Sequence, residues 1–340
     1  NFNMGRKRET GGEIVLSYLE QYPDWYPANS LSRIIFDENK HTFDSSEQVR
    51  CLIRYYQGQM GERNRKQVVK YSDFVRDRKK STKFAQPETK AIEKKVFELG
   101  SGYRRVGFIS DLQVPFHDPK AIDLCFDYLN KEKIDCLFIN GDLLDFYGIS
   151  QYVKDPRDRD FLGEYEDCIE MVMYIKQSFD VPIYYNLDAN HEARWGRYMA
   201  GKAPELLGLK LFSIEDLLRL DEFGIKYIKD IHHIKIGKLP VIHGDTVFRF
   251  GSGVFPAKRL FDKVKTSCIA SHVHRSSEYT DKSPITDEMS TCWTTGHLMH
   301  PNVDYAKHTD QYNQGFAVIY KDASGDYEVH NKRIYKGKVR

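Results

Sequence analysis

Five short clusters of residues that can bind metal ions follow one another along the last two thirds of the chain. They read Asp111-Leu112-Gln113, Gly141-Asp142, Asn190-His191-Glu192, His243-Gly244-Asp245 and His272-Val273-His274. Carboxylate, amide and imidazole groups in this mixture suit two divalent cations that share a bridging carboxylate. The clusters therefore predict a metal-dependent hydrolase, with a phosphoester bond as the favoured target.

Each cluster directly follows a short apolar run of the kind that forms a buried strand. The first strands are expected at 106–109, 136–139 and 183–185, with amphipathic helices at 119–131 and 160–178 between them. This βαβαβ order predicts an α/β layered domain. Because the carboxyl ends of strands meet at one edge of such a sheet, ligands far apart in sequence can converge there. Further strands expected after residue 239 indicate a second sheet packed on the first.

The composition divides the chain into three parts. We expect a small helical domain at 1–61, a basic linker or arm at 62–97 and the catalytic domain at 98–340. Residues 1–97 hold 19 Lys and Arg against 13 Asp and Glu, a balance of +6, whereas the remainder balances at −4. A basic front end on a mildly acidic body suggests a polyanionic partner such as DNA or RNA.

The helical front end has two interpretations. An N-cap at Ser45 and apolar residues at helical spacing indicate short helices joined by a turn, with Arg50 and Arg54 exposed. That arrangement resembles a helix-turn-helix module that contacts nucleic acid. Alternatively, it is a helical cap that packs on the catalytic domain and binds nothing.

Composition also excludes several classes of protein. Of the 340 residues 41% are hydrophobic, yet no apolar stretch reaches the length of a membrane span and no secretory signal pattern opens the chain. Six cysteines show no CxxC spacing, which predicts reduced thiols and argues against zinc held by cysteine. These features together predict a cytoplasmic protein with no membrane partner.

The order and types of the five clusters resemble the calcineurin-like metallophosphoesterase superfamily. Its signature is Asp-x-His, Gly-Asp-x-x-Asp/Asn, Gly-Asn-His-Asp/Glu, an isolated His, and Gly-His-x-His, which this chain follows over roughly residues 104–275. The resemblance implies a two-sheet αββα sandwich. The arrangement is also similar to phosphoesterases of phage genomes that carry a helix-turn-helix segment before the catalytic domain, which would place the protein in the host cytoplasm.

The resemblance also implies a role for each motif residue. Asp142 would bridge two cations, with Asp111, Gln113 and His274 completing the first site and Asn190, His243 and His272 completing the second. His191 would contact substrate and protonate the leaving group, while a water shared by the cations attacks phosphorus. Manganese is the favoured metal, with magnesium, iron, zinc and nickel as alternatives.

Four further residues receive secondary roles. Arg194 could clamp a phosphate or form a surface salt bridge, and His117 could approach substrate or lie on a surface loop. Asp145 matches the family's second acidic position and is expected to support the ligands or form a turn. Asp245 is expected to orient the imidazole of His243.

Three positions depart from the family pattern. Gln113 stands where a histidine is usual, and its weaker amide oxygen predicts a loosely bound first cation that favours Mn or Mg over Zn. Gln113 could instead contact a metal-bound water. Ala189 and Ser271 replace glycines, which keeps the backbone approach close because both are small.

The ligand motifs predict the reaction class and leave the substrate open. A phosphodiesterase or nuclease is favoured, because residues 1–97 are basic. A phosphomonoesterase is the alternative, since Arg194 near Asn190-His191-Glu192 resembles protein phosphatases, although residues 142–147 lack their Asp-Arg-Gly. A DNA-binding or structural protein with a decayed site is the third hypothesis, and Gln113 is the residue that supports it.

Overall fold

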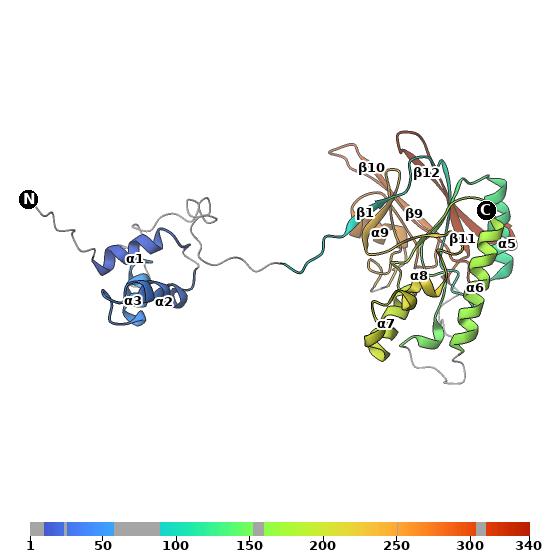
Figure 1. Ribbon diagram of the computed structural model, residues 1–340. Coiled ribbons are helices and arrows are strands. Elements are labelled where there is room, and N and C mark those ends of the chain that lie inside the picture. Colours follow the sequence, from blue (N-terminus) through green and yellow to red (C-terminus); the bar gives the residue numbers. More distant parts are fainter. Residues whose placement is uncertain (1–9, 24–25, 58–88, 152–159, 250, 304–310) are drawn as a thin grey trace, which may run out of the picture. The chain divides into compact units, whose positions relative to one another are not determined.

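The structure is a computed structural model that describes residues 10–23, 26–57, 89–151, 160–249, 251–303 and 311–340. It contains two compact units, residues 1–91 and 92–340, which are described separately (Figure 1). Within the described ranges, no helix combines the length and the apolar character needed to cross a membrane. Most of the expected basic linker, residues 58–88, lies outside the described residues.

The described residues of the first unit form the helices α1 (Gly11–Leu19), α2 (Ala28–Glu38) and α3 (Ser46–Tyr56). Thr10 and Glu13 form a capping box at the start of α1, and the Ser45 side chain caps α3 by accepting from Gln48 N. Their apolar faces meet in one core of Ile14, Val15, Leu19, Tyr22, Leu31, Ile35, Phe43, Val49 and Ile53. The predicted helices of the front end are therefore confirmed.

The two arginines of α3 have different surroundings. Arg50 donates to Asn29 Oδ1 at 2.9 Å and pairs with Glu47, so it ties α3 to α2. Arg54 remains exposed, as expected. One of the two arginines expected to face solvent is thus held by contacts inside its own unit.

The second unit contains two sheets. The seven-stranded sheet has the order β13-β12-β11-β2-β3-β4-β5, and the six-stranded sheet has the order β1-β6-β7-β8-β10-β9. In the first sheet β2 to β5 are parallel, and β11 joins β2 antiparallel. The first sheet contains β2 (Arg105–Ile109), β3 (Cys136–Ile139), β4 (Ile183–Asn186), β5 (Lys226–Ile228), β11 (Gly315–Lys321), β12 (Tyr327–Tyr335) and β13 (Lys338–Val339).

The second sheet joins strands from both ends of the unit. It contains β1 (Lys95–Glu98), β6 (Ile231–Ile236), β7 (Leu239–Ile242), β8 (Cys268–Ala270), β9 (Ser277–Lys282) and β10 (Met289–Thr294). The helices are α5 (Pro119–Lys131), α6 (Phe161–Ser178), α7 (Glu192–Lys202), α8 (Ile214–Leu217) and α9 (Pro256–Val264), with 3₁₀ turns η2 (Tyr147–Ile149), η4 (Pro204–Leu206) and η5 (Lys210–Phe212).

Alternation along the strands produces four layers. In β3, Cys136 and Phe138 belong to the core shared by the two sheets, whereas Leu137 and Ile139 face α5 and α6. A third cluster packs α9 on the outer face of the six-stranded sheet. Figure 1 shows α5 and α6 on one side of the unit and α9 on the other. The expected αββα sandwich is confirmed.

The second unit begins at residue 92, earlier in the chain than the expected boundary at residue 98. The first three residues of β1 lie in the segment assigned to the basic linker, and β1 pairs parallel with β6. Many Lys and Arg residues and few large aliphatic ones made residues 62–97 resemble a linker. The physical reason is that β1 is an edge strand, and edge strands commonly carry exposed charges.

Candidate metal centre

The five ligand clusters all lie at strand ends, on loops that come from both sheets. Asp111, Asp142 and Asn190 follow β2, β3 and β4 of the seven-stranded sheet, while His243 and His272 follow β7 and β8 of the six-stranded sheet. The strand-end placement expected from the sequence is therefore present. Because each sheet supplies part of the set, the site depends on how the two sheets pack.

Much of this ligand set has an unusual backbone conformation. The residues with positive φ include Asp111 (54°), Gln113 (51°), Asp142 (51°), His272 (69°) and His274 (57°). The left-handed region costs a residue with a side chain about 1–3 kcal/mol when the surroundings enforce it, and such residues cluster at functional sites. We conclude that the loops are held in shape to aim these side chains.

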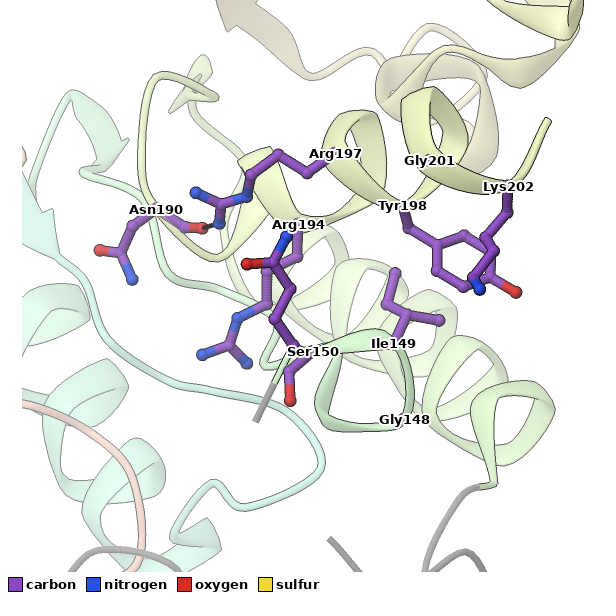
Figure 2. A pocket seen from close by; sticks show the side chains of 10 residues that line it. Gly148, Ile149, Ser150, Asn190, Arg194, Arg197, Tyr198, Gly201 and Lys202 are labelled. Atoms are coloured by element: carbon purple, nitrogen blue, oxygen red, sulfur yellow. Dashed lines mark hydrogen bonds between the residues drawn. The ribbon is translucent and has the colours of Figure 1, made fainter. Parts of the chain in front are cut away.

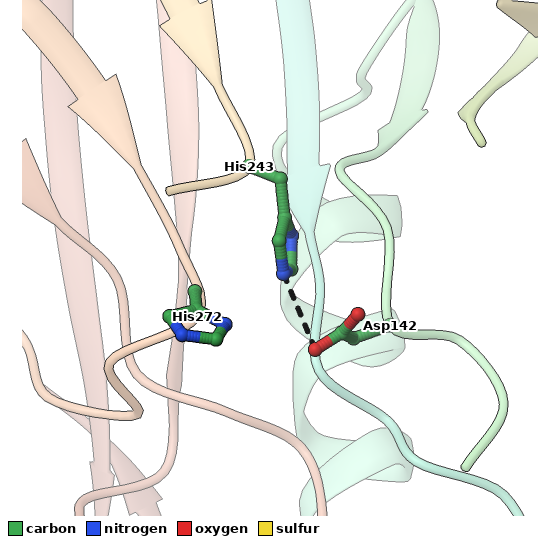
Figure 3. Close-up of side chains that lie close together, drawn as sticks. All are labelled: Asp142, His243 and His272. Carbon is green, nitrogen blue, oxygen red and sulfur yellow. Dashed lines mark ion pairs between the residues drawn. The ribbon is translucent and has the colours of Figure 1, made fainter. Parts of the chain in front are cut away.

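Asp142, His243 and His272 form a group whose potential ligand atoms lie within 4.8 Å of one another (Figure 3). Asp142 Oδ2 is 3.2 Å from His243 Nε2, its contact across the two sheets. Asp142 Oδ2 and His272 Nδ1 are buried, and no described residue forms a hydrogen bond with His272 Nδ1. A divalent cation in place of the His243 proton would satisfy both atoms.

The orientation of His243 is set by a backbone carbonyl. Its Nδ1 lies 2.8 Å from Asn140 O, and since a carbonyl only accepts, Nδ1 carries the proton. Nε2 then faces Asp142 and Asn190 Oδ1, the latter at 3.2 Å. The prediction that Asp245 orients this ring was wrong. The end of β3 brings the Asn140 carbonyl to the ring, so the position beside Nδ1 is already taken.

Electrostatics at His243 also favour a cation. Burial lowers its pKa, but the charge and hydrogen bond of Asp142, the charge of Asp111 and the hydrogen bond to Asn140 together outweigh burial and raise the pKa to about 10. By contrast, burial lowers the pKa of His272 to about 4, and the charge on His243 adds to that effect. In the absence of metal, His243 thus holds one proton for the anionic site, at the position where a cation would be held.

The other ligands, Asp111, Gln113 and His274, contact one another. His274 Nε2 is 3.0 Å from Asp111 Oδ1 and 3.1 Å from Gln113 Nε2. Asp111 Oδ2 accepts from the Ser110 hydroxyl and, at 3.2 Å, from His272 N. In this part of the site the side chains partly satisfy each other, which leaves less electrostatic drive to bind a cation.

A further buried imidazole lies against this group. The ring of His297, on the segment after β10, is 5.2 Å from that of His274. His297 is buried, and its Nδ1 makes no hydrogen bond with any described residue. No motif marks His297, so its approach to His274 could be recognised only in the folded structure.

His191 contacts the predicted bridging residue through its backbone. Its N–H donates to Asp142 Oδ1 at 3.2 Å, while its Nδ1 is 3.1 Å from Asp145 O and therefore carries the ring proton. Burial lowers the pKa of His191, although the charges of Asp142 and Asp145 oppose this. The resulting neutral ring has an accepting Nε2, which lies 3.7 Å from Asp142 Oδ2.

Arg194 is engaged by Asp145. Its Nη1 donates to both Asp145 Oδ1 and Asp145 O at 2.6 Å, and its Nη2 lies 3.3 Å from His191 Nε2. The expected supporting role of Asp145 is consistent with this pair. These contacts use three of the five N–H donors of the guanidinium, so Arg194 links Asp145 to His191. The prediction that Arg194 also contacts a phosphate stays a prediction.

Glu192 has a positioning role that sequence reasoning did not assign. Its carboxylate accepts from Asp142 N and Leu143 N, both at 3.1 Å, and from the Tyr185 hydroxyl. Burial and then the charge of Asp142 raise the pKa of Glu192 to about 8. Glu192 thus holds the backbone of the predicted bridging residue. The available signal was its place in the Asn-His-Glu cluster.

A buried polar network joins the two sheets beneath the ligands. Asn140 Nδ2 donates to Ile242 O at 2.9 Å and to Ser271 Oγ at 3.0 Å, and Asn186 Nδ2 donates to Asn140 Oδ1 at 3.2 Å. Ser271, where the family pattern has glycine, therefore contributes a hydroxyl to the network. The glycine that must remain is Gly141, because its φ is +88° and an added Cβ would lie 2.3 Å from Ala189 Cβ.

A cavity of about 720 Å³ opens beside Asn190 (Figure 2). Its lining residues come from η2 and the residues after it, and from α7 with the residue before it; they are Gly148, Ile149, Ser150, Gln151, Asn190, Arg194, Arg197, Tyr198, Gly201 and Lys202. Three of these carry a positive charge and none is acidic. The cavity thus connects a predicted ligand to a basic surface.

His117 lies away from these groups. It lines a separate depression between α5 and α6, together with Pro119, Asp167 and Tyr174 among others. Burial lowers its pKa. The expectation that His117 approaches substrate is not supported, because its loop leads directly into α5, which begins at Pro119, and so turns toward α6.

Comparisons with known proteins find distant relatives. No family model matches the chain. The Gene 54 protein of Mycobacterium phage L5 is 25% identical over 235 residues, covering 64% of this chain and 89% of that protein. The Gene 54 protein of Mycobacterium phage D29 is 23% identical over 232 residues, covering 65% and 90%.

Among solved structures, wild-type Vps29 of Entamoeba histolytica, complexed with Zn²⁺, matches at 14% identity and a TM-score of 0.33, covering 69% of this chain and 96% of that one. YfcE, a phosphoesterase from E. coli, matches at 8% identity and a TM-score of 0.29, covering 67% and 98%. Likenesses at this level transfer no activity. The chain's own two facing sheets, with the ligand motifs converging between them, agree with the arrangement that the sequence resemblance implied.

Proposed function

We propose that the protein is a phosphoesterase that uses two divalent cations, with manganese favoured, to hydrolyse phosphodiester bonds of nucleic acid. The observation that carries this proposal is the convergence of the ligand atoms of Asp142, His243 and His272, which include a buried imidazole nitrogen that no described residue satisfies. These residues come from different sheets, and two of them, Asp142 and His272, adopt a costly backbone conformation. A merely structural role would not require that arrangement.

The residues divide into two sets by the cation they would hold. Asn190, His243 and His272 would hold one cation and Asp111, Gln113 and His274 the other, with Asp142 shared between them. Bound cations supply Lewis acidity, which makes a water nucleophilic at neutral pH and neutralises charge on the phosphoryl oxygens. A hard amide oxygen at Gln113 suits Mn or Mg better than Zn.

His191 and Arg194 would act on the substrate side of Asp142. Hydrolysis forms a bond from water oxygen to phosphorus and breaks the bond to the leaving oxygen, which then needs a proton. His191 Nε2 currently accepts from Arg194 Nη2. We infer that His191 must gain a proton at Nε2 before it can protonate the leaving oxygen, which the nearby charge of Asp142 favours and burial opposes.

Nucleic acid is favoured as substrate because positive charge gathers beside the site. Of the described residues that line the cavity next to Asn190, three are cationic and none is acidic. Residues 1–97 add a balance of +6. Phosphate contacts of this kind supply most of the sequence-independent affinity for nucleic acid. The phage-encoded relatives are consistent with a phage-type enzyme acting in the host.

The test is hydrolysis of bis(p-nitrophenyl) phosphate and p-nitrophenyl phosphate side by side, by metal-stripped protein with and without added Mn²⁺. We expect Mn-dependent turnover with preference for the diester, and loss of turnover in Asp142→Asn. Preference for the monoester would overturn the diesterase assignment and favour a phosphomonoesterase. No turnover on either substrate, with substoichiometric Mn binding, would overturn the enzyme assignment and favour a decayed site.

A further inference from the structure

We propose that the cavity between η2 and α7 binds one unpaired nucleotide of the substrate strand, next to the phosphoester that is cleaved. The stacking surface would be Tyr198 and the phosphate contacts Arg197 and Lys202. This inference rests on the proposed phosphoesterase function and adds a recognition site to it. Hereafter these three residues are called the nucleotide shelf.

The position of the cavity connects it to the metal centre. Asn190 both lines the cavity and lies with its Oδ1 3.2 Å from His243 Nε2. Arg197 Nη2 donates to Asn190 O at 2.7 Å, so one edge of its guanidinium is fixed against the ligand loop (Figure 2). A group bound in the cavity would therefore lie beside Asn190, which is itself one of the predicted ligands of the cation.

The charge of the cavity suits a phosphate chain. Arg197 and Lys202 are both exposed, and Lys202 has no ion-pair partner among the described residues. They lie on α7 five positions apart. No acidic side chain lines the cavity among the described residues, so the described lining does not repel an anionic backbone.

The aromatic ring of the nucleotide shelf, Tyr198, is supported by a stack of two further aromatic rings. Tyr198 is 39% exposed, and its ring stacks on Trp195 at a centroid distance of 6.4 Å and 22° between planes. Trp195 in turn stacks on Phe161 at 5.7 Å and 5°, and its Nε1 donates to Phe212 O at 2.8 Å. An exposed ring on a fixed aromatic stack is the platform on which unpaired bases bind.

Shape favours an unpaired nucleotide over a duplex. A cavity of about 720 Å³ has the volume of a small-molecule site. A base can reach the Tyr198 ring only when its face is free of stacking neighbours. A paired duplex presents its edges and phosphates, so it would leave the aromatic part of the shelf unused.

The experiment compares two substrates in the full-length protein with Mn²⁺. A single-stranded oligonucleotide can occupy the shelf, whereas methyl p-nitrophenyl phosphate tests the metal centre with little reach beyond it. We expect Tyr198→Ala to lower kcat/KM for the oligonucleotide by about 10-fold or more, as for loss of one stacked base. Lys202→Ala should lower it less and weaken its salt dependence. Both variants should retain hydrolysis of the small diester, and Tyr198→Phe should retain both activities.

A matched control is available on β12. Tyr335 is 61% exposed with Lys336 over its ring at 5.2 Å, so Tyr335→Ala removes a similar tyrosine next to a lysine elsewhere. This variant should cleave both substrates with the same kcat/KM as the wild-type protein. Oligonucleotide cleavage that is unaffected by Tyr198→Ala would overturn the shelf and leave the phosphoesterase function standing. A tenfold loss that is equal for duplex and single strand would overturn the unpaired specificity.

Failure of the proposed function can be recognised separately. If the wild-type protein cleaves neither substrate, anisotropy of a fluorescent oligonucleotide on the metal-free protein still tests the shelf. Weaker binding by Tyr198→Ala than by Tyr335→Ala would support the shelf without catalysis, and equal binding would overturn it. A Tyr198-dependent activity confined to a phosphopeptide would also overturn it, because the ligand would then be protein.

Discussion

The two halves of the candidate metal centre differ in how closely their side chains contact one another. On the Asp142 side, formed by Asp142, Asn190, His243 and His272, His243 Nε2 lies 3.2 Å from Asp142 and Asn190, and His272 Nδ1 has no hydrogen-bond partner among the described residues. On the Gln113 side, formed by Asp111, Gln113 and His274, His274 Nε2 lies 3.0–3.1 Å from the carboxylate and the amide, while its Nδ1 has no such partner.

This difference indicates unequal affinity for two cations. A cation on the Asp142 side replaces the proton of His243 and also gives His272 a partner, whereas one on the Gln113 side must replace the contacts of His274 Nε2 with Asp111 and Gln113. The replacement of histidine by Gln113 adds to the inequality, because an amide is the weaker donor. We therefore expect one tight and one weak site, and the following predictions test that order.

The largest effect is expected for Asp142→Asn, which weakens the residue shared by both halves. Loss of the shared negative charge should lower Mn-dependent turnover by at least about 10²-fold and remove tight metal binding. The thermal midpoint of the metal-free protein should remain close to that of the wild type. Turnover comparable to the wild type would contradict the bridging role.

The second-largest effect is expected for Glu192→Gln. This change loosens the loop that carries Asp142 without removing a predicted ligand. The carboxylate holds Asp142 N and Leu143 N, both at 3.1 Å. Loss of such supporting contacts typically lowers metal affinity about 10–100-fold. Isothermal titration with Mn²⁺ would measure this. An unchanged affinity would show that the loop holds its shape without the Glu192 charge.

Gln113→His should reduce the difference between the two halves. Imidazole in place of the amide is expected to strengthen the weaker Mn site about 10-fold while leaving the tighter one unchanged. Manganese EPR at increasing metal concentration can count the two classes of site. If the tighter class changed instead, the assignment of Gln113 to the weaker site would be wrong.

A smaller effect is expected from pH. In the absence of metal, burial lowers the pKa of His243, but Asp142, Asp111 and Asn140 together raise it to about 10, so near neutral pH the ring is protonated. Because a metal binds neutral imidazole, binding must release this proton and tighten as pH rises. One proton predicts an increase of about threefold between pH 7.0 and 7.5. Titration in buffers of different ionisation enthalpy would detect the release.

Much of this architecture could be predicted from local patterns. Apolar runs and helical spacing located β2, β3, β4 and α5 because these signals depend only on neighbouring residues. Ligand types at strand ends predicted the metal centre, since parallel strands of a sheet share one carboxyl edge. The chemistry of the site was thus determined by residue types and their order along the chain.

Contacts between distant segments could not be predicted in this way. His243 is oriented by Asn140, 103 residues earlier, rather than by its neighbour Asp245. Arg194 is engaged by Asp145, which lies 49 residues before it. His297 reaches His274 without any motif. Each partner is chosen by how the two sheets pack, and packing depends on the whole core rather than on local sequence.

The sequence by itself therefore determined which groups can bind a cation and the strands that carry them. Only the tertiary structure decided which of those groups are satisfied by one another and which remain available. The reason is that hydrogen-bond satisfaction is a property of a folded interior, where each buried polar atom takes whichever partner the surrounding layers bring within reach.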